Sequence, residues 1–247
     1  MAKNNPVNNG YDEQAVYAVV DTALTNFYKA LTGKLTTIKL NEILKKKNPY
    51  LYRAKGLNNA GQIVGSILAA YISSSEETLF GNHFFEPIAL AVSGGQKGMA
   101  EGIDITIDKD NTIYSIAVKS GPSVFNADSR KRQEQNFQSA QKRAQQARKA
   151  FLPVVGYGYG KKNIKPGHEK FYLELAGKDF WEWLTGDPDF YTKMVTFMGT
   201  NPDDYAKEFE EAYNKAENRM IREFTINYCK EDGSIDWDAL IKFNSGD

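Results

Sequence analysis

Cysteine and histidine are scarce in this chain of 247 residues, which contains one cysteine, Cys229, and two histidines. A single thiol excludes an internal disulfide and also a zinc site built from cysteines. The two histidines have no third partner at metal-ligand spacing, so the sequence gives no support to a histidine zinc centre. The shortage of cysteine also gives no support to a protein that matures in an oxidising compartment.

Long apolar runs are missing as well. No segment approaches the length needed to span a bilayer, and the N-terminal residues 1–6 lack the apolar stretch of a signal peptide. We therefore expect a protein of the prokaryotic cytoplasm that has no membrane partner.

Hydrophobic residues nevertheless make up 41% of the chain, which is enough for a buried core. We find no internal repeat and no low-complexity linker, so we expect a single domain over residues 1–247. Its parts would be an N-terminal helical part (1–72), a catalytic α/β core (73–160) and an acidic, aromatic-rich and mostly helical part (161–247). The order helix, strand, strand, helix, strand in the core predicts an α/β fold with a mixed β-sheet.

Several residues give signals for helix ends. The residue before a proline avoids the helical region, so Asn48-Pro49 is expected to end a helix and residues 50–55 are expected to be irregular. Residues 73–77 contain two overlapping capping boxes, which predict that one helix ends and another begins there. Pro87 lacks a backbone N–H and is expected to kink the following apolar helix or to restart it at Glu86.

The chain has no net charge, because 31 Lys and Arg balance 31 Asp and Glu. The charges are nevertheless segregated along the sequence. Residues 119–165 contain eleven basic and two acidic side chains, and residues 34–55 contain seven basic and one acidic. Residues 166–247 contain nine basic and eighteen acidic side chains. Phosphate binding needs local positive potential, so the two basic segments are the expected nucleic-acid contacts. A merely solvated charged surface is the alternative interpretation.

The most informative segment is a predicted β-hairpin. Residues 102–108 and 112–121 have the pattern of two strands, and residues 109–111 form a tight polar turn between them. Asp104 enters the first strand and Lys119 leaves the second, so their side chains should meet at one edge of a sheet. A carboxylate there can hold a divalent cation, and an ammonium group can orient a water molecule or neutralise a phosphate. This arrangement is typical of nucleases.

The triplets Gly102-Ile103-Asp104 and Ala117-Val118-Lys119 resemble the signature of the PD-(D/E)XK nuclease superfamily. The resemblance implies a restriction-endonuclease-like core with N-terminal and C-terminal helical extensions. Asp104 would bind Mg²⁺, the backbone carbonyl of Val118 is a further candidate ligand, and Lys119 would position the attacking water. The chain departs from the signature at Ala117, where the superfamily has an acidic residue.

The missing carboxylate must therefore come from another element, and superfamily members are known to carry it on a helix. Glu86 and Glu134 are the two candidates in this sequence. We favour Glu86, because a glutamate among Phe84, Phe85 and Ile88 needs a cation to compensate its burial. Glu134 lies in a polar run, where an exposed acid requires no explanation, but it remains the alternative.

A closer resemblance covers the chain from about residue 48 onwards. It is similar to type II restriction endonucleases of the PmeII kind, and this implies Mg²⁺-dependent cleavage of double-stranded DNA at a short specific sequence, with Mn²⁺ able to substitute. We expect a homodimer, because a symmetric dimer fits double-strand cleavage at a two-fold symmetric site. The resemblance also places Ser75, Glu76 and Glu77 near the site, although capping boxes alone would explain them. It is carried by residues 48–53, 73–78, 80–81, 85–86, 119–122, Asn126 and 180–183.

Further residues are candidates for contact with DNA. Arg, Asn and Gln side chains can recognise base edges, whereas Lys and Ser mostly contact phosphates, and about half of such contacts carry no sequence information. The run from Gly156 to Lys162 lacks the spacing of a P-loop, so no nucleotide cofactor is expected. The candidates are Ser120, Ser123, Asn126, Arg130, Arg132, Gln133, Lys161 and Lys162.

Two other functions remain open at this stage. The same core occurs in structure-specific and repair nucleases, which cut flaps or junctions instead of a specific duplex sequence. The loss of the acidic residue at Ala117 would also fit a non-catalytic DNA-binding protein.

Overall fold

The structure is a computed structural model that describes residues 7, 10–162, 170–199 and 203–246. Its contacts group the chain into two compact units. Unit 1 consists of Met1–Phe27 and Thr78–Asn201, and unit 2 consists of Tyr28–Glu77 and Pro202–Asp247. The expectation of one domain over the whole chain stays a prediction.

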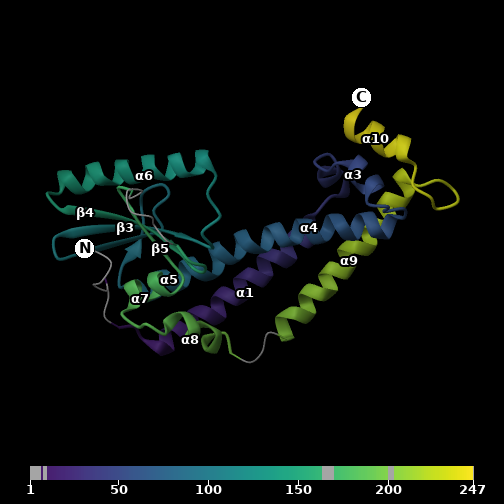
Figure 1. The fold of residues 1–247 in the computed structure, drawn as a ribbon. Helices are drawn as coiled ribbons and strands as arrows, with labels where there is room; N and C mark the ends of the chain where they lie inside the picture. Colours follow the sequence, from purple (N-terminus) through teal and green to yellow (C-terminus); the bar gives the residue numbers. More distant parts are fainter. Residues whose placement is uncertain (1–6, 8–9, 163–169, 200–202, 247) are drawn as a thin grey trace. The chain divides into compact units, whose positions relative to one another are not determined.

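Unit 1 is built on a mixed β-sheet with the strand order β1-β2-β3-β4-β5 in the described residues (Figure 1). β1 pairs with β2 and β2 with β3 in antiparallel fashion, whereas β3 pairs with β4 and β4 with β5 in parallel fashion. A mixed sheet flanked by helices is the predicted α/β, restriction-endonuclease-like fold class, which is thereby confirmed. The strands are β1 (Gln96–Lys97), β2 (Ile105–Lys109), β3 (Thr112–Lys119), β4 (Ala150–Tyr157) and β5 (Leu173–Ala176).

The predicted hairpin is formed by β2 and β3. Lys109 pairs with Thr112, so the turn between the strands consists of Asp110 and Asn111. These two residues have positive φ angles of 49° and 58°, a conformation that Asp and Asn tolerate better than most residues. The turn fixes the register and therefore brings the start of β2 beside the end of β3.

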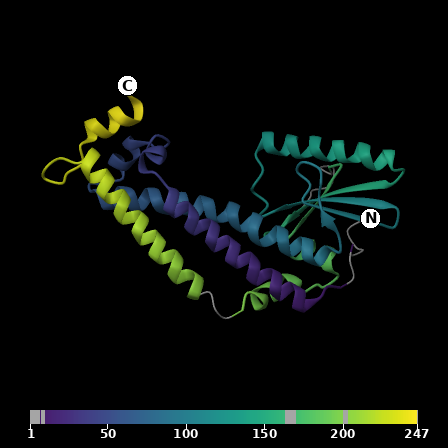
Figure 2. The same cartoon turned by 180° about the vertical axis from the view of Figure 1, so that it is seen from behind.

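Helices cover both faces of the sheet (Figures 1 and 2). On one face, α6 (Ala127–Gln146) places Phe137 and Ala140 in an apolar cluster with Ala117 of β3. On the other face, α5 (Glu86–Ser93) and α7 (Lys178–Thr185) pack in the main core with Ile116 and Val118. The period of two along β3 thus directs neighbouring side chains to different layers.

The remaining helices belong to one unit or contribute residues to both. None of the helices in the described parts of the chain is long and apolar enough to cross a lipid bilayer. These helices are α1 (Glu13–Thr37), α2 (Leu40–Leu44), α3 (Pro49–Ala54), α4 (Ala60–Phe80), α8 (Phe190–Phe197), α9 (Asp203–Tyr228), α10 (Trp237–Ser245) and the π-helix η1 (Gly81–Phe85).

Two of the predicted helix ends are wrong. Residues 50–55 are not irregular, because Asn48 caps α3 by accepting a hydrogen bond from the backbone N–H of Leu51 at 3.3 Å, with Pro49 in the first helical position. Proline is favoured at that position, so the Asn-Pro pair marks a helix start here. Residues 73–77 lie inside α4, because the helix continues through them to Phe80 and their side chains do not cap a new one. The restart at Glu86, where α5 begins with Pro87 in its first turn, agrees with the prediction.

Candidate active site

Asp104 and Lys119 meet at the edge of the sheet. Asp104 precedes β2 and its Oδ2 atom accepts a hydrogen bond of 2.7 Å from the backbone N–H of Val118. The Nζ atom of Lys119 lies 3.5 Å from the same Oδ2 and donates a hydrogen bond of 3.0 Å to the carbonyl of Val118. Both side chains are partly open to solvent, at 21% and 27% exposed, so a substrate can reach them.

Glu86 joins this pair from the first turn of α5. Burial raises the pKa of Glu86, and the negative charge of Asp104 raises it further, whereas the charges of Lys97 and Lys119 lower it. The Glu86 side chain is therefore close enough to Asp104 and Lys119 for their charges to act on it. Two carboxylates that oppose each other's ionisation in a partly buried place are typical of a cation site.

The π-helix η1 determines how Glu86 is presented. Its turns are wider than those of an α-helix, and such segments often occur at functional sites. Gly81, at its start, lies against the residue that follows the candidate lysine, since a Cβ atom added to Gly81 would lie 3.2 Å from Cβ of Ser120. The segment that carries Glu86 is thus packed directly against the end of the strand that carries Lys119.

Ala117 stands at the strand position where the sequence signature has an acid. Its side chain is fully buried in the apolar cluster under α6, together with Phe137, Val155 and Tyr157. A carboxylate at this position would be desolvated, at a cost of several kcal/mol unless a cation compensated it. The apolar cluster under α6 therefore disfavours an acid at position 117, and Glu86 and Glu134 stay the candidates for the second carboxylate.

Glu134 and the serine-glutamate run have other contacts. Glu134 lies on α6, where its Oε1 atom accepts a hydrogen bond of 3.5 Å from the hydroxyl of Tyr172. Ser75 belongs to unit 2, is buried, and accepts a hydrogen bond of 3.2 Å from Nζ of Lys34. Glu76 and Glu77 lie beside it on α4, and a role of these residues near the site stays a prediction.

The residues present fit a magnesium ion. Mg²⁺ is usually bound by one or two carboxylates together with water and substrate phosphate oxygens, so it does not need a full set of protein ligands. Asp104 and Glu86 supply two carboxylates, and the carbonyl of Val118 is a further oxygen at the same edge. In the parts of the chain that the structure describes, no group of three or more His, Cys, Asp or Glu could hold a metal ion.

Three of the candidate DNA-contacting residues have structural contacts within unit 1. Asn126 caps α6 and accepts a hydrogen bond of 2.8 Å from the backbone N–H of Ser129. Arg130 donates to Tyr172 and to Glu174, both at 3.2 Å. Gln133 is buried and donates a hydrogen bond of 2.8 Å to the carbonyl of Gly102, two residues before Asp104. These contacts hold α6 against the segment that positions the candidate site.

The other candidates differ in their accessibility. Ser120 is buried against Gly81. Ser123 and Lys161 are exposed, and Arg132 is exposed in an ion pair with Glu101. Lys162 is 23% exposed, with Nζ 3.7 Å from Oε1 of Glu174. Contact of these residues with DNA stays a prediction.

Lys97 is a residue near the site that the sequence interpretation missed. It lies on β1, which pairs with Ile105 at the start of β2, and its positive charge lowers the pKa of Glu86. In the sequence, the one indication of a role for Lys97 was its position in the glycine-rich segment that leads into the hairpin. That signal is weak, because an exposed lysine in a loop is common.

Glu174 of β5 organises the cations behind the site. It is 3% exposed and accepts hydrogen bonds of 2.7 Å from Tyr157 and from Lys170, in addition to the contact with Arg130. Burial alone would raise the pKa of Glu174, but the hydrogen bonds from Lys170 and Tyr157 and the nearby positive charges lower it below its ordinary value. The carboxylate is therefore ionised and ties β4, β5 and α6 together.

Glu174→Gln is expected to lower the free energy of unfolding at neutral pH by about 2 kcal/mol, because Arg130 and Lys170 lose their charged acceptor. Since the pKa of Glu174 is lower in the folded chain, its contribution is complete above the ordinary value of 4.5 and is lost as the pH falls through the folded-state pKa. Thermal unfolding of both proteins from pH 7 to pH 3 measures this. A difference in Tm that persists unchanged at pH 3 contradicts it.

Comparison with known proteins gives one family. The family model described as type II restriction endonuclease EcoO109I matches residues 14–210, which is most of the chain and includes Glu86, Asp104 and Lys119. No curated protein shows significant similarity to the chain.

Proposed function

Since this chain belongs to the family of the type II restriction endonuclease EcoO109I, we propose that it hydrolyses phosphodiester bonds of double-stranded DNA at a short specific sequence in a reaction that requires Mg²⁺. Membership of the family makes the protein a type II restriction endonuclease, and DNA its substrate. The metal, the specific sequence and the roles of individual residues are the proposed part.

The observation that supports the proposal best is the contact of Asp104 with Lys119 at the sheet edge, with Glu86 of a second segment within range of both charges. Asp104 and Lys119 come from the hairpin, with Nζ and Oδ2 3.5 Å apart, and the charge of each acts on Glu86 of α5. Two carboxylates and one amine at an accessible sheet edge are the groups that phosphodiester hydrolysis needs.

Each of these residues has a proposed role in the reaction. Asp104 and Glu86, with the carbonyl of Val118, would hold Mg²⁺, which when bound supplies charge neutralisation at the scissile phosphate and a more acidic water. Lys119 would hold the attacking water by a hydrogen bond and offset the charge that develops on the phosphate. The oxygen of the water forms the new bond to phosphorus and gives up one proton to solvent, one ester P–O bond breaks, and the leaving oxygen takes up one proton from solvent, so that the protons balance.

Specific binding is proposed to involve the exposed part of the segment that follows Lys119. Ser123 is exposed on the loop that follows Lys119, Arg132 is exposed on α6, and Lys161 is exposed in the segment after β4. Lysine contacts would hold phosphates, whereas Arg132 has the geometry to recognise a guanine edge. We also propose a homodimer, which light scattering with and without DNA would reveal by its mass.

Digestion of a plasmid of known sequence, followed by sequencing of the ends, tests the proposed function. We expect discrete fragments with Mg²⁺ or Mn²⁺ and none with EDTA. Random ends, or cleavage only of flaps and junctions, would replace the proposal by a structure-specific nuclease. An intact plasmid, together with no uptake of Mn²⁺ by calorimetry, would instead indicate a DNA-binding protein without catalysis.

A further inference from the structure

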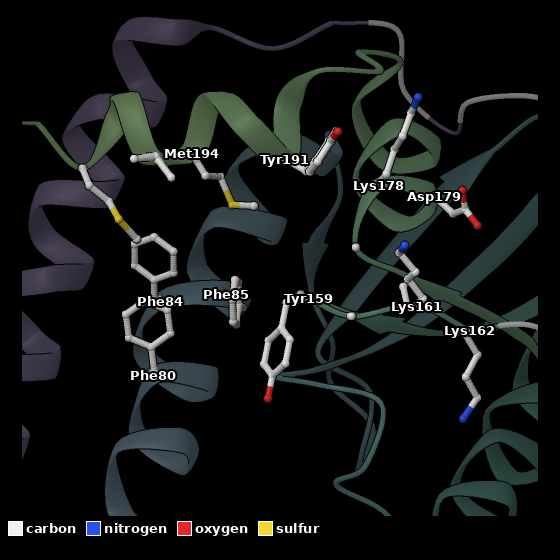
Figure 3. Close-up of a pocket in the computed structure, with 16 residues that line it drawn as sticks. Phe80, Phe84, Phe85, Tyr159, Lys161, Lys162, Lys178, Asp179, Tyr191 and Met194 are labelled. Carbon is white, nitrogen blue, oxygen red and sulfur yellow. The ribbon is translucent and has the colours of Figure 1, made fainter. Parts of the chain in front are cut away.

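Unit 1 contains a pocket of about 570 Å³ beside the candidate active site (Figure 3). Aromatic and methionine side chains line one part of it, among them Phe85, Tyr159, Tyr191 and Met194. Tyr159 and Tyr191 are 47% and 41% exposed, so their rings are accessible from the opening. A volume between ~300 and ~1,000 Å³ with a mostly apolar lining is usual for sites that bind small organic groups.

The pocket is joined to the catalytic strand through the backbone. The N–H of Gly158 donates a hydrogen bond of 2.8 Å to the carbonyl of Lys119, and the N–H of Tyr159 donates one of 3.1 Å to the carbonyl of Ser120. Tyr159 therefore lies next to the residue that follows Lys119. The carboxyl ends of the parallel strands β3 and β4 meet here, and this is the edge at which α/β sheets usually bind ligands.

Glycines allow the strand ends to pack closely enough to form the pocket wall. A Cβ atom at Gly158 would lie 2.5 Å from the ring of Phe85, and one at Gly160 would lie 2.7 Å from Pro122. Gly177 has a positive φ of 52°, and a Cβ atom there would lie 2.5 Å from the carbonyl oxygen of Gly160. The glycine-rich run from Gly156 to Gly160, which is no P-loop, thus serves to bring Tyr159 against both Phe85 and the loop after Lys119.

The two ends of the pocket differ in chemistry (Figure 3). Phe80, Phe84 and Met194 lie toward one end, whereas Lys161, Lys162 and Lys178 lie toward the other. Asp179 also lies at the basic end, with its carboxylate turned away from the aromatic rings. A ligand that matches this lining has a flat ring for the aromatic part and a negative charge for the lysines. A nucleotide has both.

We propose that this pocket binds one nucleotide of the DNA substrate, with its base turned out of the duplex and stacked on Tyr159. The phosphate would lie toward Lys161 and Lys178. Stacking on Tyr159 is open to every base, because each base has a π face. The inference rests on the proposed function, because it takes its ligand from the DNA that the enzyme cleaves.

Binding of single nucleotides tests the pocket independently of cleavage. Saturation-transfer NMR of the full chain with 2′-deoxyadenosine, 2′-deoxycytidine and thymidine 5′-monophosphates is expected to show transfer to the base protons of the nucleotides. Tyr159→Ala should weaken nucleotide binding about tenfold, the usual effect of losing one base–aromatic stack. Tyr159→Phe, which keeps the ring, should bind nucleotides as the wild type does. Tyr17→Ala is the matched control, because Tyr17 is 42% exposed in the same unit and does not line the pocket.

A cross-linking measurement tests whether the nucleotide comes from the duplex. DNA with one photoreactive base, a 5-iodopyrimidine or an 8-bromopurine, placed in turn at each position of the plasmid fragment that is cut, is irradiated with the enzyme in Ca²⁺. We expect one position to cross-link to Tyr159 or Tyr191. Cross-links only to other residues, with normal binding of monophosphates, would make this a site for free nucleotides and overturn the proposal.

Two further outcomes also overturn it. No transfer to any nucleotide, with an enzyme that cleaves plasmid normally, removes the pocket proposal and leaves the proposed function intact. Val195 is an exposed residue that also lines the pocket. A mass in solution that falls on Tyr159→Ala or Val195→Asp, without an effect on nucleotide binding, would identify the pocket as a contact between copies of the chain. If the wild type binds nucleotides but does not cleave the plasmid, the result counts against the proposed function instead.

Discussion

Lys119→Ala is expected to abolish DNA cleavage while DNA binding persists. The amine of Lys119 lies 3.5 Å from Asp104 and is the cation of the hairpin closest to the proposed position of the scissile phosphate. Removal of one group that stabilises developing charge typically lowers the rate ~10²–10³-fold. Its effect on binding should be small, because one phosphate contact among many is lost. Single-turnover cleavage and fluorescence anisotropy with labelled duplex measure the two quantities separately.

The controls for this variant address folding and charge. Lys119 is partly exposed and packs against no buried carboxylate, so its circular dichroism spectrum and Tm should match those of the wild type. Lys161→Ala, which removes an exposed lysine in the segment after β4, should weaken binding and make it less dependent on salt concentration, while single-turnover cleavage at saturation is kept. Normal cleavage by Lys119→Ala would end the assignment of the hairpin as catalytic.

The second large effect is expected from Glu86→Gln, compared with Glu134→Gln. Glutamine keeps the size of the side chain and removes the charge, so loss of cation binding is the main consequence. We expect Glu86→Gln to lower cleavage at least ~10²-fold and to weaken Mn²⁺ binding measured by calorimetry. Glu134→Gln should change cleavage and Mn²⁺ binding by less than about twofold, because the carboxylate of Glu134 accepts a hydrogen bond from Tyr172.

The pair of variants also decides the choice between the two acids. A loss of cleavage in Glu134→Gln with full activity in Glu86→Gln would assign the role of the second carboxylate to Glu134 of α6. Full activity in both would mean that Asp104 and the backbone are sufficient. Glu86→Gln is further expected to be as stable as the wild type or slightly more stable, because burial and the charge of Asp104 both disfavour the ionised form of Glu86.

The hairpin could be predicted from sequence because all its determinants are local. Asp110 and Asn111 fit the left-handed turn, and the alternation of apolar residues fixes the register. The meeting of Asp104 with Lys119 follows from that register alone. The mixed sheet also follows from local signals, since a helix of the length of α6 between β3 and β4 permits a parallel crossover.

Features that depend on packing could not be predicted in the same way. An Asn-Pro pair such as Asn48-Pro49 can follow the end of one helix or begin the next, and only the surrounding contacts decide between the two. Arg130 and Gln133 resemble base-reading residues in sequence, but Glu174 and Gly102 supply partners for them within the fold. The aromatic pocket likewise requires glycines and rings from segments that are distant in sequence.

The five-residue π-helix η1 makes the catalytic arrangement sensitive to the length of the chain at a place that carries no chemistry. A π turn has one residue more than an α turn, and each residue of a helix turns the following side chains by roughly 100°. The wider turn absorbs its extra residue, so deletion of one residue between Gly81 and Phe85 should convert η1 into regular helix and leave Glu86 in a similar orientation, whereas insertion of one more residue should turn Glu86 away from Asp104. The proposed second carboxylate thus tolerates the loss of one residue at this joint but not the gain of one, whereas the hairpin acid and amine are set by their own register.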